Sequence, residues 1–386
     1  MKKPAGTFLF LSLAIVSLSL NSFGQKHPTK RVADTSKLTT ADNRDTLEMV
    51  FVLDTTGSMS GLIDGAKQRI WGIINDVMQK PSKPRVRVGL VAYRDNGDEY
   101  VTKLLEITED LDKVYTTLMD YRADGGGDTP ENVRKALAEG VRNAGWAKSR
   151  DGLAQIVFLV GDAPPQSYQQ EPDFLVTTAE AVHKNMIVNT IQCGSEDGTK
   201  EVWQSIALRG EGKYFAIAQD GGVQAITTPY DTKLADLAAK LGKTYVTYGA
   251  KDKRDSQSHA QSVSERRITT DASMGAQAER ALNKAVNTFQ YDGDLVQDVE
   301  NDTVKIENVK TENLPEDMQK LSVAERKKVI DKRIAERKAI RAEILTLSKQ
   351  RDEYVAAERA KAGRKNGFDT AVALALKEQL AKKGIR

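Results

Sequence analysis

Short apolar runs alternate with amphipathic stretches between residues 45 and 249. Residues 47–53 and 154–160 are almost continuously apolar, which is typical of central parallel strands that are buried on both faces. Residues 86–93 alternate between apolar and other side chains, which also predicts a strand. Residues 62–78 instead carry apolar side chains at helical spacing. Strands that alternate with helices predict an α/β fold with a doubly wound, mostly parallel sheet and helices on both of its faces.

The remaining segments of this stretch continue the alternation. About 200 residues are enough for one such domain, so we assign 45–249 to it. The helix at 231–241 is expected to close the domain. Further strands are predicted at 101–107 (at an edge), 186–192 and 214–217, and further helices at 111–121, 131–144, 174–184 and 200–208.

The composition changes after Gly249. Residues 250–275 are charged and polar and are interpreted as a linker, and 276–386 as a charged helical C-terminal region with an acidic, irregular stretch at 293–315. One long helix is predicted at 322–361. It packs back on its own chain in the favoured interpretation, with a coiled-coil dimer as the alternative, because three arginines fall where a coiled-coil seam needs apolar residues. The apolar stripe comprises Ile330, Ile334, Ile340, Ile344, Leu347 and Tyr354, and the arginines are Arg337, Arg341 and Arg351.

The N-terminus has the pattern of an export signal. Lys2 and Lys3 precede an apolar run, and small residues up to Gly24 fit a cleavage site, so residues 1–24 are predicted to be a signal peptide. A buried core helix is the alternative. Residues 25–44 form a polar lead-in. The mature protein is expected in the periplasm or outside the cell, without a membrane span, and N-terminal sequencing that still began at Met1 would contradict this.

Composition narrows the classes of partner. The 386 residues carry a net charge of +3, with 40% hydrophobic and 29% charged residues, which is ordinary for a globular protein and does not call for a nucleic-acid partner. The single cysteine, Cys193, cannot form an internal disulfide and is expected to be a small buried hydrophobic residue.

Three segments at predicted strand ends carry oxygen-bearing side chains. Asp54, Thr56 and Ser58 occupy alternate positions of one tight loop, and Asp162 directly follows a later strand. Thr129 follows a run of three glycines, which permit close backbone approach. Ligands of doubly wound sheets bind outside the carboxyl ends of the strands, and hard cations such as Mg²⁺ prefer oxygen ligands. Helix capping, or a salt bridge for Asp162, remains the alternative for each segment.

Together, these segments resemble the metal-ion-dependent adhesion site of the von Willebrand factor type A domain. The resemblance covers about half of the chain and implies a doubly wound fold that binds Mg²⁺, with Mn²⁺ or Ca²⁺ as other options. It also implies capture of a carboxylate from a protein partner. The implied metal ligands are Asp54, Thr56, Ser58, Thr129 and Asp162.

Two departures from the family pattern and a subgroup resemblance refine this expectation. Thr56 stands where the family often has serine, and a double proline replaces the common Asp-Gly turn in the third loop. The signatures at 93–95, 125–131 and 161–165 resemble an exported bacterial subgroup. Asp95 and Asp128 are then expected to support the ligands or to form ion pairs.

An enzyme is the main competing class. The three histidines, His27, His183 and His259, do not accompany a nucleophile, and Met59 occupies the centre of the only stretch that approaches a nucleophile elbow. No phosphate-binding glycine loop is present. We therefore predict a metal-dependent binding module for adhesion or complex assembly and no enzyme.

Three other functions are alternatives to this one. A structural envelope protein that acts through its helical tail is the first, and a hydrolase with Asp54 or Asp162 as base is the second. The third, a subunit of an ATP-driven metal-insertion machine, conflicts with the export signal.

Overall fold

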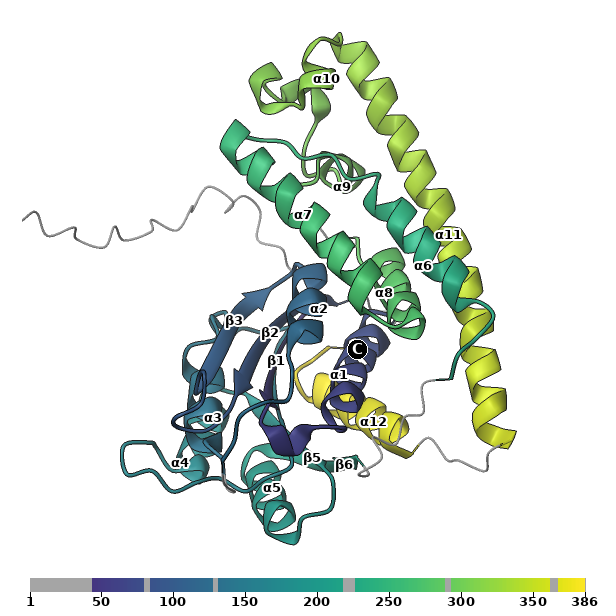
Figure 1. Ribbon diagram of the computed structural model, residues 1–386. Helices are drawn as coiled ribbons and strands as arrows, with labels where there is room; N and C mark the ends of the chain where they lie inside the picture. The colour runs from purple at the N-terminus through teal and green to yellow at the C-terminus, as the bar shows by residue number, and fades with distance from the viewer. Residues whose placement is uncertain are drawn as a thin grey trace, which may run out of the picture. The chain divides into compact units, whose positions relative to one another are not determined.

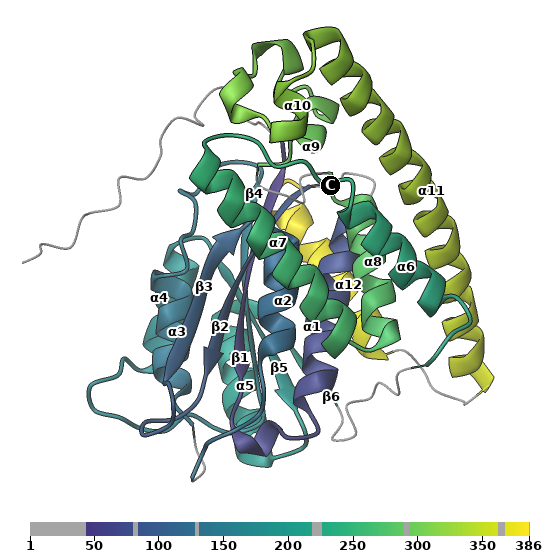
Figure 2. The same ribbon diagram turned by 45° about the horizontal axis from the view of Figure 1, so that its top comes forward.

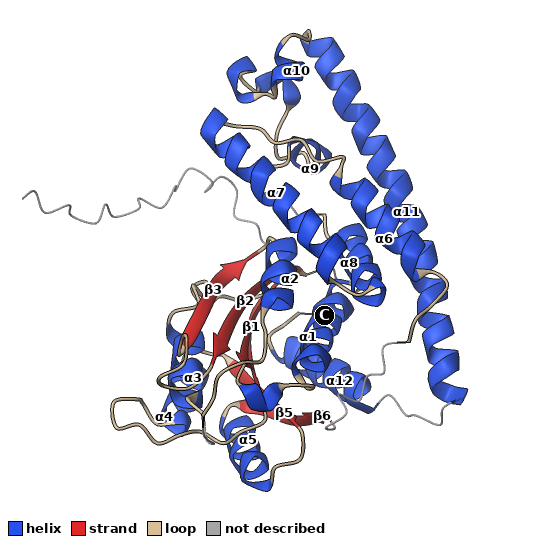
Figure 3. Cartoon of the chain, in the orientation of Figure 1, coloured by secondary structure: helices blue, strands red, loops and turns tan. Residues whose placement is uncertain are grey.

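The computed structural model describes residues 44–79, 84–127, 131–217, 226–288, 293–361 and 367–385. The predicted signal peptide and nearly all of the predicted lead-in lie outside these ranges. A six-stranded sheet has the order β3-β2-β1-β4-β5-β6, and every neighbouring pair is parallel except β2 and β3 (Figures 1 and 3). The predicted fold class is confirmed. The strands are β1 Thr46–Asp54, β2 Arg85–Tyr93, β3 Thr102–Thr108, β4 Leu153–Gly161, β5 Ile187–Cys193 and β6 Glu211–Ile217.

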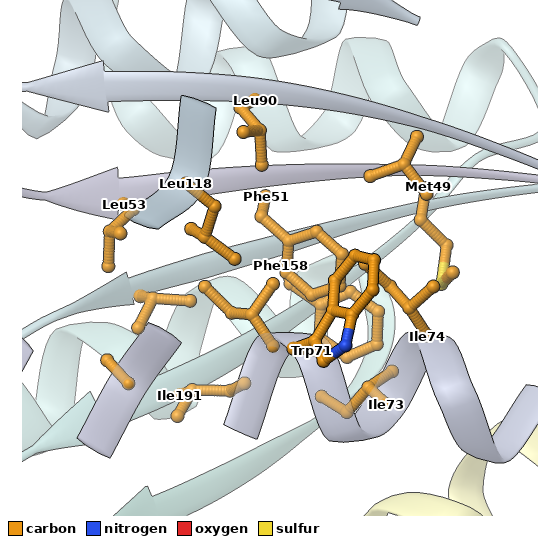
Figure 4. Packing of buried hydrophobic residues seen from close by; sticks show 14 of the residues in the cluster. Met49, Phe51, Leu53, Trp71, Ile73, Ile74, Leu90, Leu118, Phe158 and Ile191 are labelled. Carbon is orange, nitrogen blue, oxygen red and sulfur yellow. The ribbon is translucent and has the colours of Figure 1, made fainter. Parts of the chain in front are cut away.

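The central strand β1 is buried along its whole length, and its side chains alternate between two apolar layers. Phe51 points into the first layer and stacks on Phe158 of β4, with ring centroids 5.0 Å apart. Trp71 of α1 (Ile63–Met78) and Leu118 of α2 (Leu111–Asp120) cover this layer (Figure 4). These two helices thus bury part of the first face of the sheet.

The second layer lies on the opposite face. Val50 and Val52 of β1 join Val157 and Leu159 of β4 there, and Trp203 is fully buried over them. This alternation explains why the apolar runs of β1 and β4 are continuous in the sequence. The covering helices are α3 Val133–Arg142, α4 Phe174–His183 and α5 Asp197–Arg209.

The helix that closes the first face is not the predicted one. The apolar side chains of α6 (Asp231–Gly242) pack against α8 (Met274–Val286) and α11 (Val323–Lys361). Helix α12 (Gly367–Lys382) instead lies against α1 and β6 (Figures 1 and 2). Sequence order favoured α6 because it is the next helix after β6, but its apolar stripe meets other helices.

Side chains of α12 belong to the same core as the sheet. Leu376 and Leu380 are each 2% exposed and join the apolar layer that contains Phe51. Gln379 exchanges two hydrogen bonds with Asn189 of β5, at 3.1 and 2.8 Å. The contacts between α12 and the sheet therefore cross the predicted domain boundary at Gly249. The boundary itself stays a prediction.

The segment predicted as a linker at 250–275 is mostly helical, which corrects that interpretation. Helix α7 spans Lys251–Asp271, and only Arg254 and Ile268 are buried among its described side chains. The helix lacks the apolar stripe that would reveal it in a sequence. Polar contacts hold it instead, including the 2.8 Å hydrogen bond between Ser264 and Thr116 of α2.

The acidic stretch at 293–315 also contains regular structure. It was predicted to be irregular, but Leu295–Glu300 forms helix α9 and two 3₁₀ turns follow, Ile306–Asn308 and Thr311–Asn313. Leu295 and Val296 of α9 and Ile306 of the first turn join the apolar cluster that includes Ile330 of α11.

Helix α11 packs on its own chain, as predicted. Ile330, Ile340 and Ile344 are buried against neighbouring elements of the same chain. The arginines that interrupt the apolar stripe form ion pairs there: Arg337 with Asp294, Arg341 with Glu300, and Arg351 with Asp231. None of the helices in the described ranges is both long and apolar enough to cross a bilayer.

Candidate functional site

The predicted site residues meet at the carboxyl edge of the sheet. Asp54 is the last residue of β1, and Asp162 directly follows Gly161 at the end of the adjacent strand β4. The strand order reverses between β1 and β4, which is where doubly wound sheets open a crevice for ligands. The topology therefore brings together two carboxylates that are far apart in the sequence.

A chain of hydrogen bonds connects four of the five predicted metal ligands. Oγ1 of Thr56 donates to Oδ1 of Asp54 at 2.7 Å and lies 3.0 Å from Oγ of Ser58. Ser58 in turn donates to Oδ1 of Asp162 at 2.9 Å. The fifth predicted ligand, Thr129, lies outside the described residues, as does Asp128.

Helix capping does not account for the two hydroxyls. Thr56 precedes the short 3₁₀ turn Gly57–Met59, and its side chain does not cap that turn. Helix α1 begins after Leu62, which also lacks a side-chain cap. The Thr56 and Ser58 side chains are turned toward the two carboxylates instead.

Glycines allow the loops of the site to approach each other. The amide of Gly57 donates to the carbonyl oxygen of Gly125 at 3.0 Å. A Cβ atom on Gly57 would lie only 2.8 Å from that oxygen, so a larger residue would push the loops apart. Gly125 and Gly126 have φ of 74° and 71°, a conformation that costs glycine little. The glycine run thus places the second loop over the first.

Burial and like charge make the two carboxylates costly to ionise. Asp54 is fully buried, and burial, followed by the negative charge of Asp162, raises the pKa of Asp54 to about 7. Burial also raises the pKa of Asp162. In the described part of the chain neither carboxylate has an ion-pair partner, while Ser58 is exposed and leaves the site open to solvent.

Two buried oxygen atoms at the floor of the site make no hydrogen bond of normal geometry. They are Oδ2 of Asp54 and the hydroxyl of Tyr93 at the end of β2. A Cβ atom on Gly161 would lie 3.1 Å from the first atom and 2.5 Å from the second. An unsatisfied carboxylate oxygen beside hydroxyls fits a hard divalent cation. No three His, Cys, Asp or Glu side chains of the described ranges form a metal cluster by themselves, so a cation here would need the hydroxyls.

Sequence reasoning missed Glu131 and Tyr93 as members of the site. Glu131 is 2% exposed, and its pKa is raised to about 8 by burial and then by the charges of Asp54 and Asp95. Both residues belong to motifs singled out in the sequence. Their burial beside Asp54, however, arises only when segments far apart in the sequence come together, so the motifs alone do not reveal it. Asp95 was expected to support the ligands or to form an ion pair. It lies near Glu131 and accepts a hydrogen bond from Tyr168 at 2.6 Å.

Comparison with known proteins identifies the sheet domain. The sequence profile of the von Willebrand factor A domain matches residues 48–229, which include the six strands except the first two residues of β1, and all three segments of the site. Residues 48–229 are a von Willebrand factor A domain. Such domains commonly mediate protein–protein interaction or adhesion and are generally interaction modules rather than enzymes.

Similar proteins share this domain but differ in length. The von Willebrand factor A domain-containing protein 7 of Rattus norvegicus is 28% identical over 205 residues, and the Homo sapiens protein of that name is 29% identical over 199. Each match covers 50% of this chain and 20% of the relative, so the chain spans about a fifth of the length of these relatives.

Solved structures with a similar domain include two bacterial proteins. The conserved hypothetical protein BatB from Bacteroides thetaiotaomicron is 15% identical with a TM-score of 0.33, and the match covers 45% of this chain and 90% of BatB. The pilus adhesin SpaC from Lactobacillus rhamnosus GG is 14% identical with a TM-score of 0.35, and the match covers 46% of this chain and 29% of the adhesin.

Proposed function

We propose that the von Willebrand factor A domain binds a divalent cation, Mg²⁺ or alternatively Mn²⁺ or Ca²⁺, and uses it to capture an acidic group of a protein partner. Asp54, Thr56, Ser58, Thr129 and Asp162 are the proposed ligands. One observation carries the proposal: two carboxylates and two hydroxyls converge at a strand-end crevice, where Oδ2 of Asp54 is buried and makes no hydrogen bond of normal geometry.

The composition of the ligand set explains why such a cation would bind a partner. Only Asp54 and Asp162 are anionic among the five proposed ligands, so neutral hydroxyls and water molecules fill the rest of the shell and the ion remains electrophilic. Ser58 is exposed, so a carboxylate from another molecule can approach from solvent and replace a water molecule. The interface would then depend on the ion and would be lost with a chelator.

An enzymatic function has less support. His183 and His259 are exposed on α4 and α7, and neither is tied to Asp54 or Asp162 by a hydrogen bond within the described residues. A hydrolase that uses one of these carboxylates as base remains the alternative for the site. A structural envelope protein that acts through its helical tail is the alternative for the whole chain, and partner capture that survives EDTA would favour it. We also propose a periplasmic or secreted location, which rests on the N-terminal sequence alone.

The Asp54→Ala substitution tests the metal site. The wild-type protein should gain about 2.7 kcal/mol of unfolding free energy at a hundredfold excess of cation over the dissociation constant, because the ion binds only the folded state. Asp54→Ala should gain almost nothing. Asp151→Ala is the matched control, since Asp151 is exposed at the other end of strand β4 and should leave the gain intact.

The measurement is a thermal melt of the three proteins in EDTA, Mg²⁺, Mn²⁺ and Ca²⁺. Equal stabilisation of the wild-type and Asp54→Ala proteins by the same ion would place the metal elsewhere. Capture of envelope proteins by immobilised wild type in Mg²⁺ and in EDTA tests the second half of the proposal. If the same envelope proteins are retained equally in Mg²⁺ and in EDTA, and equally by the wild-type and Asp54→Ala proteins, metal-dependent capture is contradicted.

A further inference from the structure

A buried arginine connects two loops of the proposed metal site. Arg94 directly follows β2, belongs to the signature at 93–95, and is only 5% exposed. Its Nε donates to the carbonyl oxygen of Thr55 at 3.1 Å, and its Nη2 donates to the carbonyl oxygen of Arg122 at 3.2 Å. One guanidinium therefore bridges the backbones of two segments that are far apart in the sequence.

Both carbonyl groups belong to the loops that bring the proposed ligands together. Thr55 stands between the proposed ligands Asp54 and Thr56, so its peptide groups carry the backbone from which both side chains extend. Arg122 precedes the glycine run of the second loop. The Thr55 carbonyl also accepts the amide of Asp124 at 3.1 Å, so one oxygen atom receives bonds from the bridging guanidinium and from the second loop.

An aromatic ring holds the guanidinium in place. Arg94 lies over the ring of Tyr100, 4.6 Å from its centroid, and the Tyr100 hydroxyl is 2.7 Å from Oγ1 of Thr55. The ion pair of Arg94 with Glu99 is long, at 3.8 Å, and the Glu99 side chain is 68% exposed, so it contributes little. A planar guanidinium suits this position because it can bond two carbonyl groups at once and stack on a ring, whereas a lysine ammonium is a point charge.

The positive charge of Arg94 by itself opposes binding of a cation. Arg94 lies one residue beyond Tyr93, which is paired with Asp54 in the register of β1 and β2. Like charges repel, so removal of this charge should strengthen cation binding if charge were its only effect. Removal should weaken binding if the guanidinium sets the geometry of the loops, because Mg²⁺ requires its ligands at defined positions. The two roles therefore predict changes of opposite sign.

We propose that Arg94 is a positioning residue of the metal site and holds the first and second loops in the arrangement that binds the cation. This role rests on the proposed function, because it assumes that Asp54 and Thr56 bind an ion. Without the bridge, the second loop would move more freely against the first. Binding of the ion would then have to order both loops, and the affinity would fall.

The Mn²⁺ affinity of the full chain tests this role. Equilibrium dialysis of EDTA-treated, dialysed protein compares wild type with Arg94→Gln, which removes charge and bridge, and with Arg94→Lys, which keeps only the charge. Both variants should bind Mn²⁺ about tenfold more weakly, at the lower end of the loss that is typical when a partner that orients metal ligands is removed. Lys103→Gln is the matched control, because Lys103 is exposed and lies over the same Tyr100 ring, at 3.9 Å, so its loss should leave the affinity unchanged.

Hydrogen exchange in EDTA gives a second measurement that does not need the metal. The backbone amides of residues 121–127 should exchange faster in both Arg94 variants than in wild type and Lys103→Gln. The physical reason is that the Asp124 amide donates to the Thr55 carbonyl, which the bridge no longer fixes. Thermal melts in EDTA show whether each variant is folded, and Arg94→Lys carries the test if Arg94→Gln does not fold.

The outcomes separate this role from the proposed function. If wild type binds Mn²⁺, Asp54→Ala does not, and both Arg94 variants bind as wild type does, the positioning role is overturned and the metal site stands, even if the variants melt earlier. Tighter binding by Arg94→Gln would also overturn it, as would weaker binding without faster exchange at 121–127. If Asp54→Ala binds Mn²⁺ as tightly as wild type, the proposed function fails and the positioning role fails with it.

Discussion

Leu376→Ala tests whether α12 belongs to the core of the von Willebrand factor A domain. Leu376 is 2% exposed and packs in the apolar layer that contains Phe51 and Trp71. Truncation of a buried leucine to alanine costs about 2–5 kcal/mol, which combines lost burial with the cavity that remains. A docked terminal helix can shift to fill part of the cavity, so we expect the lower half of that range. Leu374→Ala is the matched control, because Leu374 is 57% exposed on the same helix, and its truncation should cost less than about 0.5 kcal/mol.

Urea unfolding of the three full-length proteins measures this difference. Trp71 is fully buried in the same layer, so tryptophan fluorescence reports on the sheet core and not only on α12. The midpoint should fall for Leu376→Ala, and the slope of free energy against urea should remain unchanged if unfolding stays cooperative. Equal midpoints for the two variants would show that α12 does not stabilise the sheet domain. A change in helical signal that leaves the tryptophan transition in place would refute the shared core.

Two further substitutions test the floor of the site and the contacts of α8. Gly161→Ala should lower the free energy of unfolding by about 1–3 kcal/mol and weaken Mn²⁺ binding, because the new Cβ would lie 2.5 Å from the Tyr93 hydroxyl. Adding Tyr93→Phe should restore part of the stability and part of the Mn²⁺ affinity. If thermal melts and Mn²⁺ titrations show no such rescue, the clash is contradicted. Although burial opposes it, the charges of Lys284 and Arg280 lower the pKa of Glu265 to about 2. Ionised Glu265 therefore stabilises the fold above about pH 4.5, and this contribution is lost as the pH falls toward 2. Glu265→Gln should cost about 1–3 kcal/mol at pH 7 and less at pH 3 in urea unfolding, and an equal cost at both values would exclude the charge interaction.

The sheet could be predicted because its signal is local. Strand β1 is a continuous apolar run that ends at Asp54, and the sequence shows both features directly. The proximity of Asp54 and Asp162 followed from one topological rule, because both stand at the ends of parallel strands. Local pattern and general topology were therefore sufficient for the fold class and for the meeting of four predicted ligands.

The features that were missed depend on tertiary contacts. Helix α7 is polar on all sides, so no apolar periodicity distinguishes it from a linker. Two helices, α6 and α12, could both have closed the sheet, and only packing decides between them. Glu131 becomes notable because it is buried beside Asp54 and Asp95, and burial of a charged side chain by distant segments leaves no trace in one sequence.

The docking of α12 has a consequence for how the domain folds while the chain is being synthesised. The strands and α1 leave the ribosome long before the residues of α12 have been translated, because α7 to α11 lie between them in the sequence. Until α12 arrives, the apolar surface of α1 and β6 that it covers is exposed to water and to other unfinished chains. A premature stop codon in the helical region would therefore damage a domain whose own coding sequence is intact.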